Sequence, residues 1–495
     1  MPLATIVRLL GSLTATLVAY GAYKILKLMH SQVTSPLRDL PGPKSPSFIY
    51  GHMKEIWAAE KGMTHEKWVQ EYGPTIQYKT FFCVLVVEGD KHKQQRKVMN
   101  PAFGPSQIRE FTEIFVSKSI ELRDRWALEI NRQSGESRID ALSWLSRATL
   151  DVIGLAGFNY KFNAIAEDLE KNELSAAFDT MFKGSPRLTM IPMLRTFIPI
   201  LRFLKTDQDV RAADAKKKMS RIGEELLQES KSLIRDKETQ RDLLTLMVKS
   251  NMATDLPENQ RMSDQDVLAQ VPTFLIAGHE TTTTGTAWAL FALTQNKAAQ
   301  DKLRKELLAV NTDNPTMEQL NALSYLDMVV RETMRLHAPV PNTMRTAVKD
   351  DTIPLNQPIT DRKGVVHESI MIPKGQTLMI PIIAVNRDKS VWGEDAREFR
   401  PERWENIPEA ATHIPGVWGN MLTFLGGPRA CIGYRFSLVE TKALLFTLVR
   451  AFEFDLAVPA KDIMKKSSLV QRPVLVTDTE GRSQMPLIIR PVVRS

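Results

Sequence analysis

Cysteine is the residue that this 495-residue chain uses least, because it occurs only as Cys83 and Cys431. Two cysteines so far apart do not form a disulfide framework, which indicates a reducing compartment for the bulk of the protein. The sequence also lacks a Cys-x-x-Cys pair, a His-Glu-x-x-His pair, a Walker loop and a Gly-x-Ser-x-Gly elbow. These absences argue against a zinc hydrolase, a P-loop nucleotide hydrolase and an α/β-hydrolase.

The chain has no strong excess of either charge. Its 65 basic and 57 acidic residues give a formal net charge of +8, which is mild for this length. No concentrated basic patch is present, so we expect no nucleic-acid partner. The balance suits an anionic membrane surface or an acidic redox partner, and a composition of 43% hydrophobic residues is ordinary for a globular protein.

One long apolar stretch stands at the amino terminus, from Leu3 to Tyr23. About 20 such residues span a bilayer core as a helix, and two lysines follow at once, which places the rest of the chain in the cytosol. A cleaved signal peptide with Arg8 in its basic part is the alternative, although a secreted product would more often carry disulfides. We expect residues 1–29 to form a membrane anchor and the proline-rich residues 30–46 to form a hinge.

The remaining chain, residues 47–495, has no internal repeat or flexible linker, which predicts one large domain. Apolar residues recur at helical spacing in most long segments, for example from Arg211 to Ser250, and Ser263 is placed to cap a long apolar helix. The strand-like segments are short and late: Ile370–Pro373, Leu378–Ile383 and Leu469–Val476. We therefore predict a mainly α fold with small β-sheets.

The segment from Met181 to Leu204 is apolar with interleaved arginines, a lysine and prolines. One interpretation is a surface that touches lipid, with cations at the headgroups. The other is a pair of short core helices joined by a proline loop. The sequence favours neither.

The second cysteine lies in a loop stiffened by glycine and proline, FLGGPRACIG, from Phe424 to Gly433. The glycines allow a tight turn and close approach to a flat group. Helical spacing resumes after Cys431, which places the sulfur at a helix amino terminus and favours the thiolate. A thiolate there is either a nucleophile or a metal ligand. A macrocycle would supply the remaining ligands of a metal, and Arg429 would then pair with its carboxylates.

The loop resembles a known signature. Phe424, Gly427, Arg429, Cys431 and Gly433 match the ten-residue haem-binding signature of the cytochrome P-450 superfamily, in which a cysteine thiolate ligates haem iron. The resemblance implies the fold of that family, with Cys431 as the metal ligand. It also implies that the other four residues shape or contact the cofactor site.

Two further motifs resemble those of the family and precede the cysteine loop in the expected order. Glu332 and Arg335 stand three residues apart, on one face of a helix. Phe399 to Trp404 resembles a second family segment, in which Arg403 would join them in a buried ion cluster. The family role of this cluster is to lock the fold behind the haem.

Polar residues occur inside the long apolar helix at Ala277-Gly278-His279-Glu280-Thr281-Thr282. Threonine hydroxyls in a helix can simply bond the carbonyls one turn back. The resemblance instead implies a catalytic pair, Glu280 and Thr281, that handles protons and water above the haem. Gly278 would permit a local widening of the helix, and the position of His279 varies in the family.

Three more cations resemble residues that hold the haem propionates. His92 and Arg96 are four residues apart, so they share a helix face. Arg345 resembles an arginine that follows the Glu332 helix in the family. Without the resemblance, the first two would be a solvated basic face.

The resemblance implies a haem-thiolate monooxygenase with heme b (iron protoporphyrin IX), acting on a lipophilic small molecule in secondary metabolism or xenobiotic oxidation. An NADPH-dependent reductase, with cytochrome b5 as a further candidate, would dock on the cysteine side near Lys97, Arg429 and Arg435. The protein would be a single-pass protein of the endoplasmic reticulum membrane, in contact with lipid, with residues 47–495 as a cytosolic catalytic domain. The sequence style is that of fungal members.

The resemblance breaks between Phe82 and Val87, where the family has several dozen more residues that roof the substrate pocket. Because such a roof excludes water and positions substrate, an alternative is a haem-binding but catalytically impaired variant. A third hypothesis, a soluble cysteine-nucleophile transferase, requires that no haem binds.

Overall fold

The structure is a computed structural model, and it describes residues 34–47, 63–78, 89–132, 135–166, 206–235, 242–252, 261–467 and 470–492, together with scattered positions between 11 and 56. Cys83 and the segment Met181–Leu204 lie outside the described residues. Among the residues it describes, no helix is both long and apolar enough to cross a bilayer.

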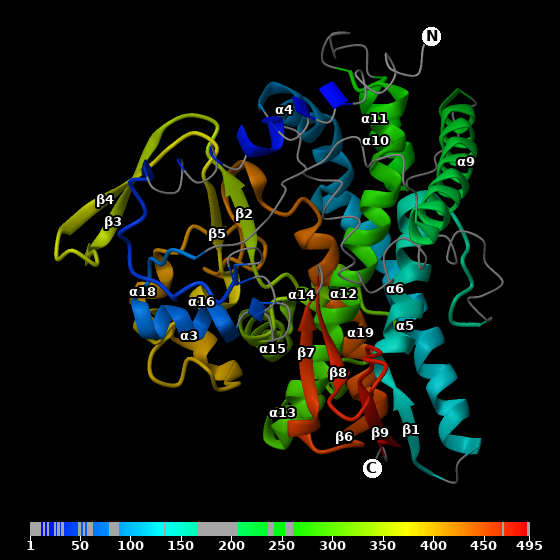
Figure 1. Cartoon of the computed structure of the whole chain (residues 1–495). Coiled ribbons are helices and arrows are strands. Elements are labelled where there is room, and N and C mark those ends of the chain that lie inside the picture. Colours follow the sequence, from blue (N-terminus) through cyan, green and yellow to red (C-terminus); the bar gives the residue numbers. More distant parts are fainter. Residues whose placement is uncertain are drawn as a thin grey trace.

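Helices make up most of the described chain, as the spacing of apolar residues predicts (Figure 1). In the first half they are α3 (Met63–Tyr72), α4 (Gly89–Met99), η1 (Asn100–Phe103), α5 (Pro105–Arg132), α6 (Ala141–Phe158), α9 (Asp207–Arg235) and α10 (Leu243–Asn251). In the second half they are α11 (Asp264–Leu268), α12 (Gln270–Gln295), α13 (Lys297–Leu308), α14 (Met317–Ala322), α15 (Ser324–Leu336), α16 (Ile382–Asn386), α17 (Lys389–Trp392), η5 (Pro401–Glu405), α18 (Glu409–Thr412), η6 (Gly427–Arg429), α19 (Tyr434–Ala451) and η7 (Ala460–Asp462).

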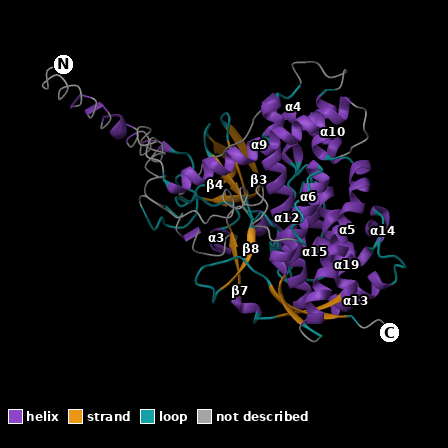
Figure 2. Cartoon of the chain, turned by 90° about the vertical axis from the view of Figure 1, so that its right-hand side faces the viewer, coloured by secondary structure: helices purple, strands orange, loops and turns teal. Residues whose placement is uncertain are grey.

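The strands form small antiparallel sheets, also as predicted. They are β1 (Ser137–Asp140), β2 (Thr343–Thr346), β3 (Asp351–Thr360), β4 (Val366–Ile372), β5 (Thr377–Ile380), β6 (Phe452–Leu456), β7 (Ile463–Ser467), β8 (Gln471–Leu475) and β9 (Pro486–Pro491). One sheet has the order β1-β9-β6, and β2-β5, β3-β4 and β7-β8 are pairs. The long helices α5, α6, α9, α10 and α12 gather on one side of the molecule, and β2–β5 lie on the opposite side together with the short helices α3, α16 and α18 (Figures 1 and 2).

A single large hydrophobic core joins elements from α4 to β9. At its centre is α12, which packs against α6, α15 and α19. Most of α12 is buried, and a helix that is apolar nearly all round is typical of the interior of a large protein. Because α19 begins just after the cysteine loop, the core fixes this loop relative to α12.

The long apolar helix predicted after Ser263 is in fact divided at Ala269 into α11 and α12. Ser263 caps the first part as predicted, since its hydroxyl accepts a hydrogen bond from the Asp266 N–H at 3.1 Å. The division follows from Pro272, which has no N–H for the carbonyl of residue 268 and whose ring crowds it. Similarly, the strand predicted at Leu378–Ile383 ends at Ile380, since Pro381 precedes the short helix α16.

The contact between α12 and α19 encloses a carboxyl group. Glu440 of α19 is fully buried, and neither of its oxygens has a hydrogen bond of standard geometry to the described residues. Burial raises the pKa of Glu440 well above 4.5, against a weaker downward pull from the Thr282 hydroxyl of α12. Folding therefore favours the protonated form of Glu440 relative to the unfolded chain.

The substitution Glu440→Gln is expected to stabilise the fold increasingly as the pH rises. The pKa of this carboxyl is higher in the folded protein than in the unfolded chain. As the pH rises from the unfolded-state pKa to the folded-state pKa, the free energy of unfolding therefore falls by about 1.4 kcal/mol per pH unit. A glutamine does not titrate and avoids this loss. The free energy of unfolding would be measured in urea at roughly pH 5, 6 and 7. The difference between Glu440→Gln and wild type should grow with each step in pH. The matched control is Glu453→Gln at an exposed glutamate of β6. An advantage independent of pH would contradict this prediction.

Candidate active site

The cysteine loop has the geometry that its glycines predict. The Cys431 N–H donates to the Phe424 carbonyl at 2.8 Å and closes the loop. Gly427 has φ +65°, a conformation that L residues rarely adopt, and a Cβ on Gly426 would lie 1.8 Å from the Pro415 carbonyl oxygen. Gly433 differs from this pattern, because its φ of −91° needs no glycine, and it serves as the N-cap residue of α19.

The Cys431 side chain is accessible, although protein surrounds it on most sides. Burial raises the pKa of the Cys431 thiol, while the Gly433 N–H and the charge of Arg96 pull the pKa down. The Gly433 N–H and the charge of Arg96 thus favour the thiolate, as expected for a sulfur just before α19, but burial outweighs them in the protein alone. A cation bound at the sulfur would reverse this balance, because a coordinating thiol is deprotonated.

The predicted cofactor-binding cations come from separate elements. His92 and Arg96 both lie on α4, and Arg96 reaches the cysteine loop, where its Nη1 donates to the Ala430 carbonyl at 3.1 Å. Arg429 lies in the loop itself. Arg345 lies on β2, where its Nη1 donates to Thr343 Oγ1 at 3.0 Å and to the Met344 carbonyl at 2.8 Å. The structure therefore brings Arg96 to the cysteine loop and gives Arg345 contacts within its own strand.

The central helix α12 has one row of solvent-exposed residues, which we call the open stripe. Thr273 and Ala277 are exposed and Thr281 is partly exposed, at four-residue spacing along a helix that is otherwise mostly buried. The Thr281 hydroxyl donates to the Ala277 carbonyl at 2.5 Å. The predicted widening at Gly278 is absent, because α12 is a regular α-helix there. Gly278 is needed for packing instead, since a Cβ would lie 2.9 Å from Ile153 Cδ1 of α6.

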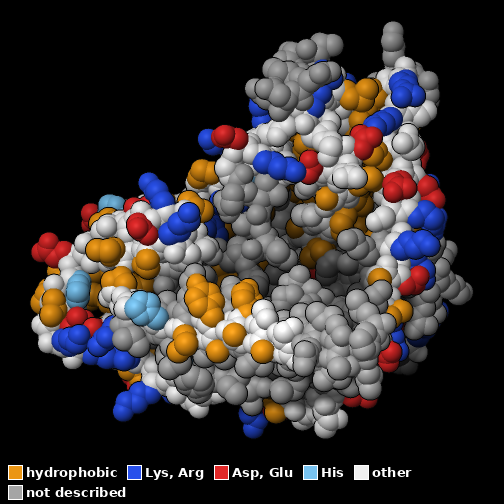
Figure 3. Space-filling model, turned by 45° about the horizontal axis from the view of Figure 1, so that its top comes forward, with side chains coloured by type: hydrophobic (Ala, Val, Ile, Leu, Met, Phe, Trp, Pro, Cys, Tyr) orange, Lys and Arg blue, Asp and Glu red, His pale blue; other side chains and the backbone are white. Residues whose placement is uncertain are grey.

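The cysteine loop and α12 belong to one site. A Cβ on Gly433 would lie 3.6 Å from the Phe103 ring, and that ring packs against Phe274 of α12 at 5.5 Å between centroids. On the other side, Thr282 Oγ1 of α12 donates to Ser437 Oγ of α19 at 3.3 Å. Seen from above, the molecule is hollowed between the β3–β4 side and the helices (Figure 3).

Glu280 lies on a buried face of α12, where it pairs with a residue that the sequence did not indicate. Its Oε2 forms an ion pair with the guanidinium of Arg472 on β8. Its Oε1 lies 3.9 Å from Nδ1 of His279, and His279 Nε2 lies 2.8 Å from Ser146 Oγ on α6. No local pattern reveals Arg472 or Ser146, because both are distant from Glu280 in the sequence.

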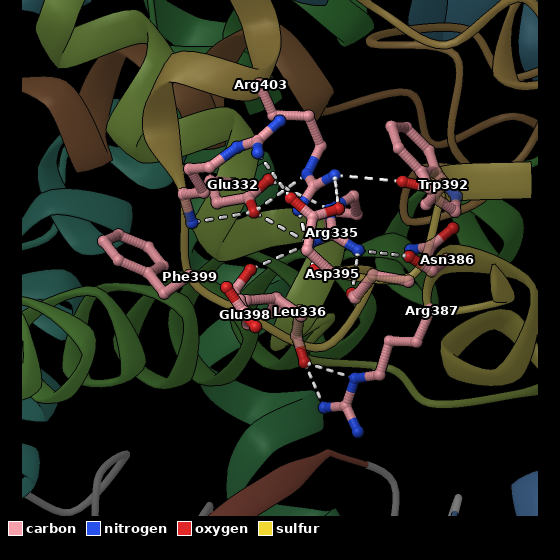
Figure 4. A network of polar contacts seen from close by, with 12 residues as sticks. Glu332, Arg335, Leu336, Asn386, Arg387, Trp392, Asp395, Glu398, Phe399 and Arg403 are labelled. Atoms are coloured by element: carbon pink, nitrogen blue, oxygen red, sulfur yellow. Dashed lines mark hydrogen bonds and ion pairs between the residues drawn. The ribbon is translucent and has the colours of Figure 1, made fainter.

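The predicted ion cluster behind the cysteine loop is confirmed (Figure 4). Arg335 Nη2 and Nε donate to the Glu332 carboxylate at 2.7 and 2.9 Å, and Arg403 Nε donates to it at 3.3 Å. All three side chains are buried. The remaining donors are used as well: Arg335 bonds the carbonyls of Asn386 and Ala396, and Arg403 bonds the Trp392 carbonyl and Asp395. The sequence did not indicate the part of Asp395.

These features define a class of site: an accessible cysteine at the amino end of a buried helix, arginines on the same side, and a polar stripe on the facing helix. The soft sulfur and the cations fit an anionic macrocycle that carries a metal ion. The glycine loop fits its flat shape.

Comparison with known proteins identifies the family. The cytochrome P-450 family model matches residues 50–477. The chain is 49% identical to cytochrome P-450 monooxygenase 205 of Postia placenta, over 98% of this chain and 99% of the relative. It is 32% identical to cytochrome P-450 monooxygenase claO of Ampulloclitocybe clavipes (93% and 94%) and 29% identical to the ganoderic acid synthetase of Ganoderma lucidum (97% and 99%). The chain belongs to the cytochrome P-450 family and is a haem-thiolate monooxygenase.

The comparison also bears on the shortened region. The alignment with monooxygenase 205 extends over 536 positions, more than the 495 residues of this chain, so the relative has residues without a counterpart here. A shortened chain is what the sequence predicts, and the predicted place between Phe82 and Val87 lies outside the described residues. The similarity to named monooxygenases gives no support to a catalytically impaired variant.

Proposed function

We propose that this protein inserts one atom of dioxygen into a lipophilic small molecule, with electrons that a reductase takes from NADPH. Cys431 would ligate the iron of heme b, and bound haem would supply the centre at which dioxygen is activated. The observation that carries this proposal is the accessible Cys431 sulfur just before α19, with the Gly433 N–H donating to it and Arg96 bonded to the neighbouring Ala430 carbonyl.

The cations around the loop would hold the haem carboxylates. Arg96 supports this role because it already contacts the loop at Ala430. Arg429, His92 and Arg345 would complete the set. Phe424, Gly427 and Gly433 would shape the loop that lies against the macrocycle.

Thr281 and Glu280 would hold and move protons on the facing side. The Thr281 hydroxyl donates a hydrogen bond to the Ala277 carbonyl. Its oxygen can still accept a hydrogen bond from a group on the exposed side of α12. Glu280 forms an ion pair with Arg472, and a carboxylate in that position can accept and release a proton.

A concave surface on the cysteine side supports docking of a reductase. This cavity of about 780 Å³ lies between α5, α14, α15 and α19, next to the cysteine loop. Arg331, Arg435 and Lys442 line it, and Asp327 is the acidic residue of the lining. Such a surplus of positive charge suits acidic residues of a redox partner such as an NADPH-dependent reductase or cytochrome b5. Lys97 and Arg429 would add to the same face.

For the cell, we propose a membrane-bound enzyme of the endoplasmic reticulum, with residues 1–29 as the anchor, 30–46 as the hinge and 47–495 as the cytosolic catalytic domain. The apolar stretch Leu3–Tyr23 and its basic flank support this arrangement. A role in secondary metabolism or xenobiotic oxidation is supported by a relative that is named for the synthesis of ganoderic acid.

The substitution Thr281→Ala tests this function. Purified protein, a fungal reductase and NADPH should convert at least one member of a lipophilic panel to an oxygenated product. In Thr281→Ala, NADPH consumption should continue while product per NADPH falls by about 10-fold or more, with a matching rise in hydrogen peroxide, because the proton-handling hydroxyl is lost. Thr281→Ser should recover most of the coupling. Unchanged coupling in Thr281→Ala, or no product from wild type that binds haem, would contradict the proposal.

A further inference from the structure

Four polar side chains form a continuous series across α12, from α6 to β8. His279 is 1% exposed, and its Nε2 lies 2.8 Å from the hydroxyl oxygen of Ser146. Its other ring nitrogen, Nδ1, lies 3.9 Å from Glu280 Oε1. Glu280 Oε2 is paired with Arg472. A buried imidazole that faces a hydroxyl on one side and a carboxylate on the other is not explained by core packing, for which an apolar side chain would serve better.

The two ends of this series lie in different surroundings. Ser146 is partly exposed on α6, whereas His279 and Glu280 are buried. Glu280 immediately precedes Thr281, which belongs to the open stripe of α12. The series therefore leads from the accessible side of α6 to the residue beside Thr281.

An imidazole between these groups can pass a proton without any net chemical change. In one concerted transfer, a hydronium ion or buffer acid in the solvent gives a proton to the Ser146 oxygen as the hydroxyl proton passes to Nε2 and the Nδ1 proton passes to Glu280 Oε1, so Ser146 stays neutral and the conjugate base remains in the solvent. The ring returns to its first tautomer before the next transfer, so one proton moves and no electron does. The distance of 3.9 Å must shorten for the second transfer, which a rotation of the Glu280 side chain provides. Between transfers the Glu280 carboxylate returns to its ion pair with Arg472.

We infer that His279 relays protons from Ser146 to Glu280 and so supplies the Thr281 side of the site. His279 is then a positioning and relay residue, because it acts through Glu280. The inference rests on the proposed function, since a proton supply matters only if dioxygen is reduced at this site.

The substitution His279→Gln separates a relay from a structural role. The glutamine amide can still hydrogen-bond Ser146, but it cannot pass a proton. We expect wild-type haem content, substrate binding and NADPH consumption, with product per NADPH lower by about 10-fold and a larger solvent deuterium isotope effect on product formation. Ser146→Ala should also lower the product per NADPH and enlarge the solvent deuterium isotope effect. The matched control is Thr149→Val: this α6 hydroxyl bonds Thr283 at 2.6 Å and the Ser146 backbone carbonyl at 3.3 Å, but not the Ser146 hydroxyl, so its loss should change neither the product per NADPH nor the isotope effect.

A second measurement does not depend on turnover. The effects of His279→Gln and Glu280→Gln on the equilibrium constant of unfolding should be non-additive by a factor of at least about 2, because interacting side chains couple. Additive effects together with fully coupled turnover in His279→Gln would overturn the inference. Absence of product from wild type would overturn the proposed function instead, so the two failures are distinguishable.

Discussion

Replacing Glu332 with alanine is expected to prevent the chain from folding into a stable protein that retains haem. The carboxylate is 0% exposed and accepts hydrogen bonds from Arg335 and Arg403. It also accepts from the Trp404 Nε1–H at 3.1 Å and the Arg400 N–H at 3.1 Å. Alanine would leave two buried guanidinium groups without their shared counter-ion. Breaking a buried pair in this way costs about 3–5 kcal/mol, against a total stability of about 5–15 kcal/mol for a typical protein.

The control for this prediction has the same chemistry and a different burial. Glu318 pairs with Arg109 at 2.6 Å, but both side chains are more than half exposed. Exposed pairs of this kind contribute about 0–1 kcal/mol, so Glu318→Ala should behave as wild type. Soluble yield, haem content and the midpoint of urea unfolding would be measured for both variants. Equal stability of Glu332→Ala and Glu318→Ala would show that the buried cluster does not hold the fold.

The second large effect is expected at Cys431. With alanine at this position, the haem iron would have no thiolate ligand, and monooxygenase turnover should fall below detection. The fold should persist, because the side chain is accessible and its backbone N–H, which closes the loop on Phe424, is retained. Far-UV circular dichroism and unfolding of the haem-free proteins should therefore agree for Cys431→Ala and wild type.

The other cysteine provides the control. Cys83→Ala removes the only alternative thiol in the chain and should keep the haem spectrum and the turnover of wild type. Residual turnover in Cys431→Ala, combined with its loss in Cys83→Ala, would reassign the ligand and contradict the account.

The sequence predicts those features whose signals are local. The conformation of Gly427, the α4 helix that carries His92 and Arg96, and the Glu332–Arg335 pair each depend on residues within a few positions. The helical and strand character of most segments follows from apolar spacing for the same reason. The sequence also contains the signal for the division at Ala269, because Pro272 disfavours an unbroken helix.

The remaining features depend on contacts between distant segments. Arg472 meets Glu280 because β8 packs beside α12, and Ser146 meets His279 because α6 does. The raised pKa of Glu440 follows from the packing of α19 against α12, and the sequence of α19 alone does not predict it. Packing also explains Gly278, which the sequence associates with a widened helix and which the structure uses for the approach of Ile153.

The central claim is that the sulfur of Cys431 binds haem iron as a thiolate. The most direct test is the carbon monoxide difference spectrum of the purified, reduced full-length protein. The account predicts the red-shifted band that a thiolate ligand produces, present in wild type and absent from Cys431→Ala. A wild-type spectrum without that band, or an unchanged band in Cys431→Ala, would contradict it.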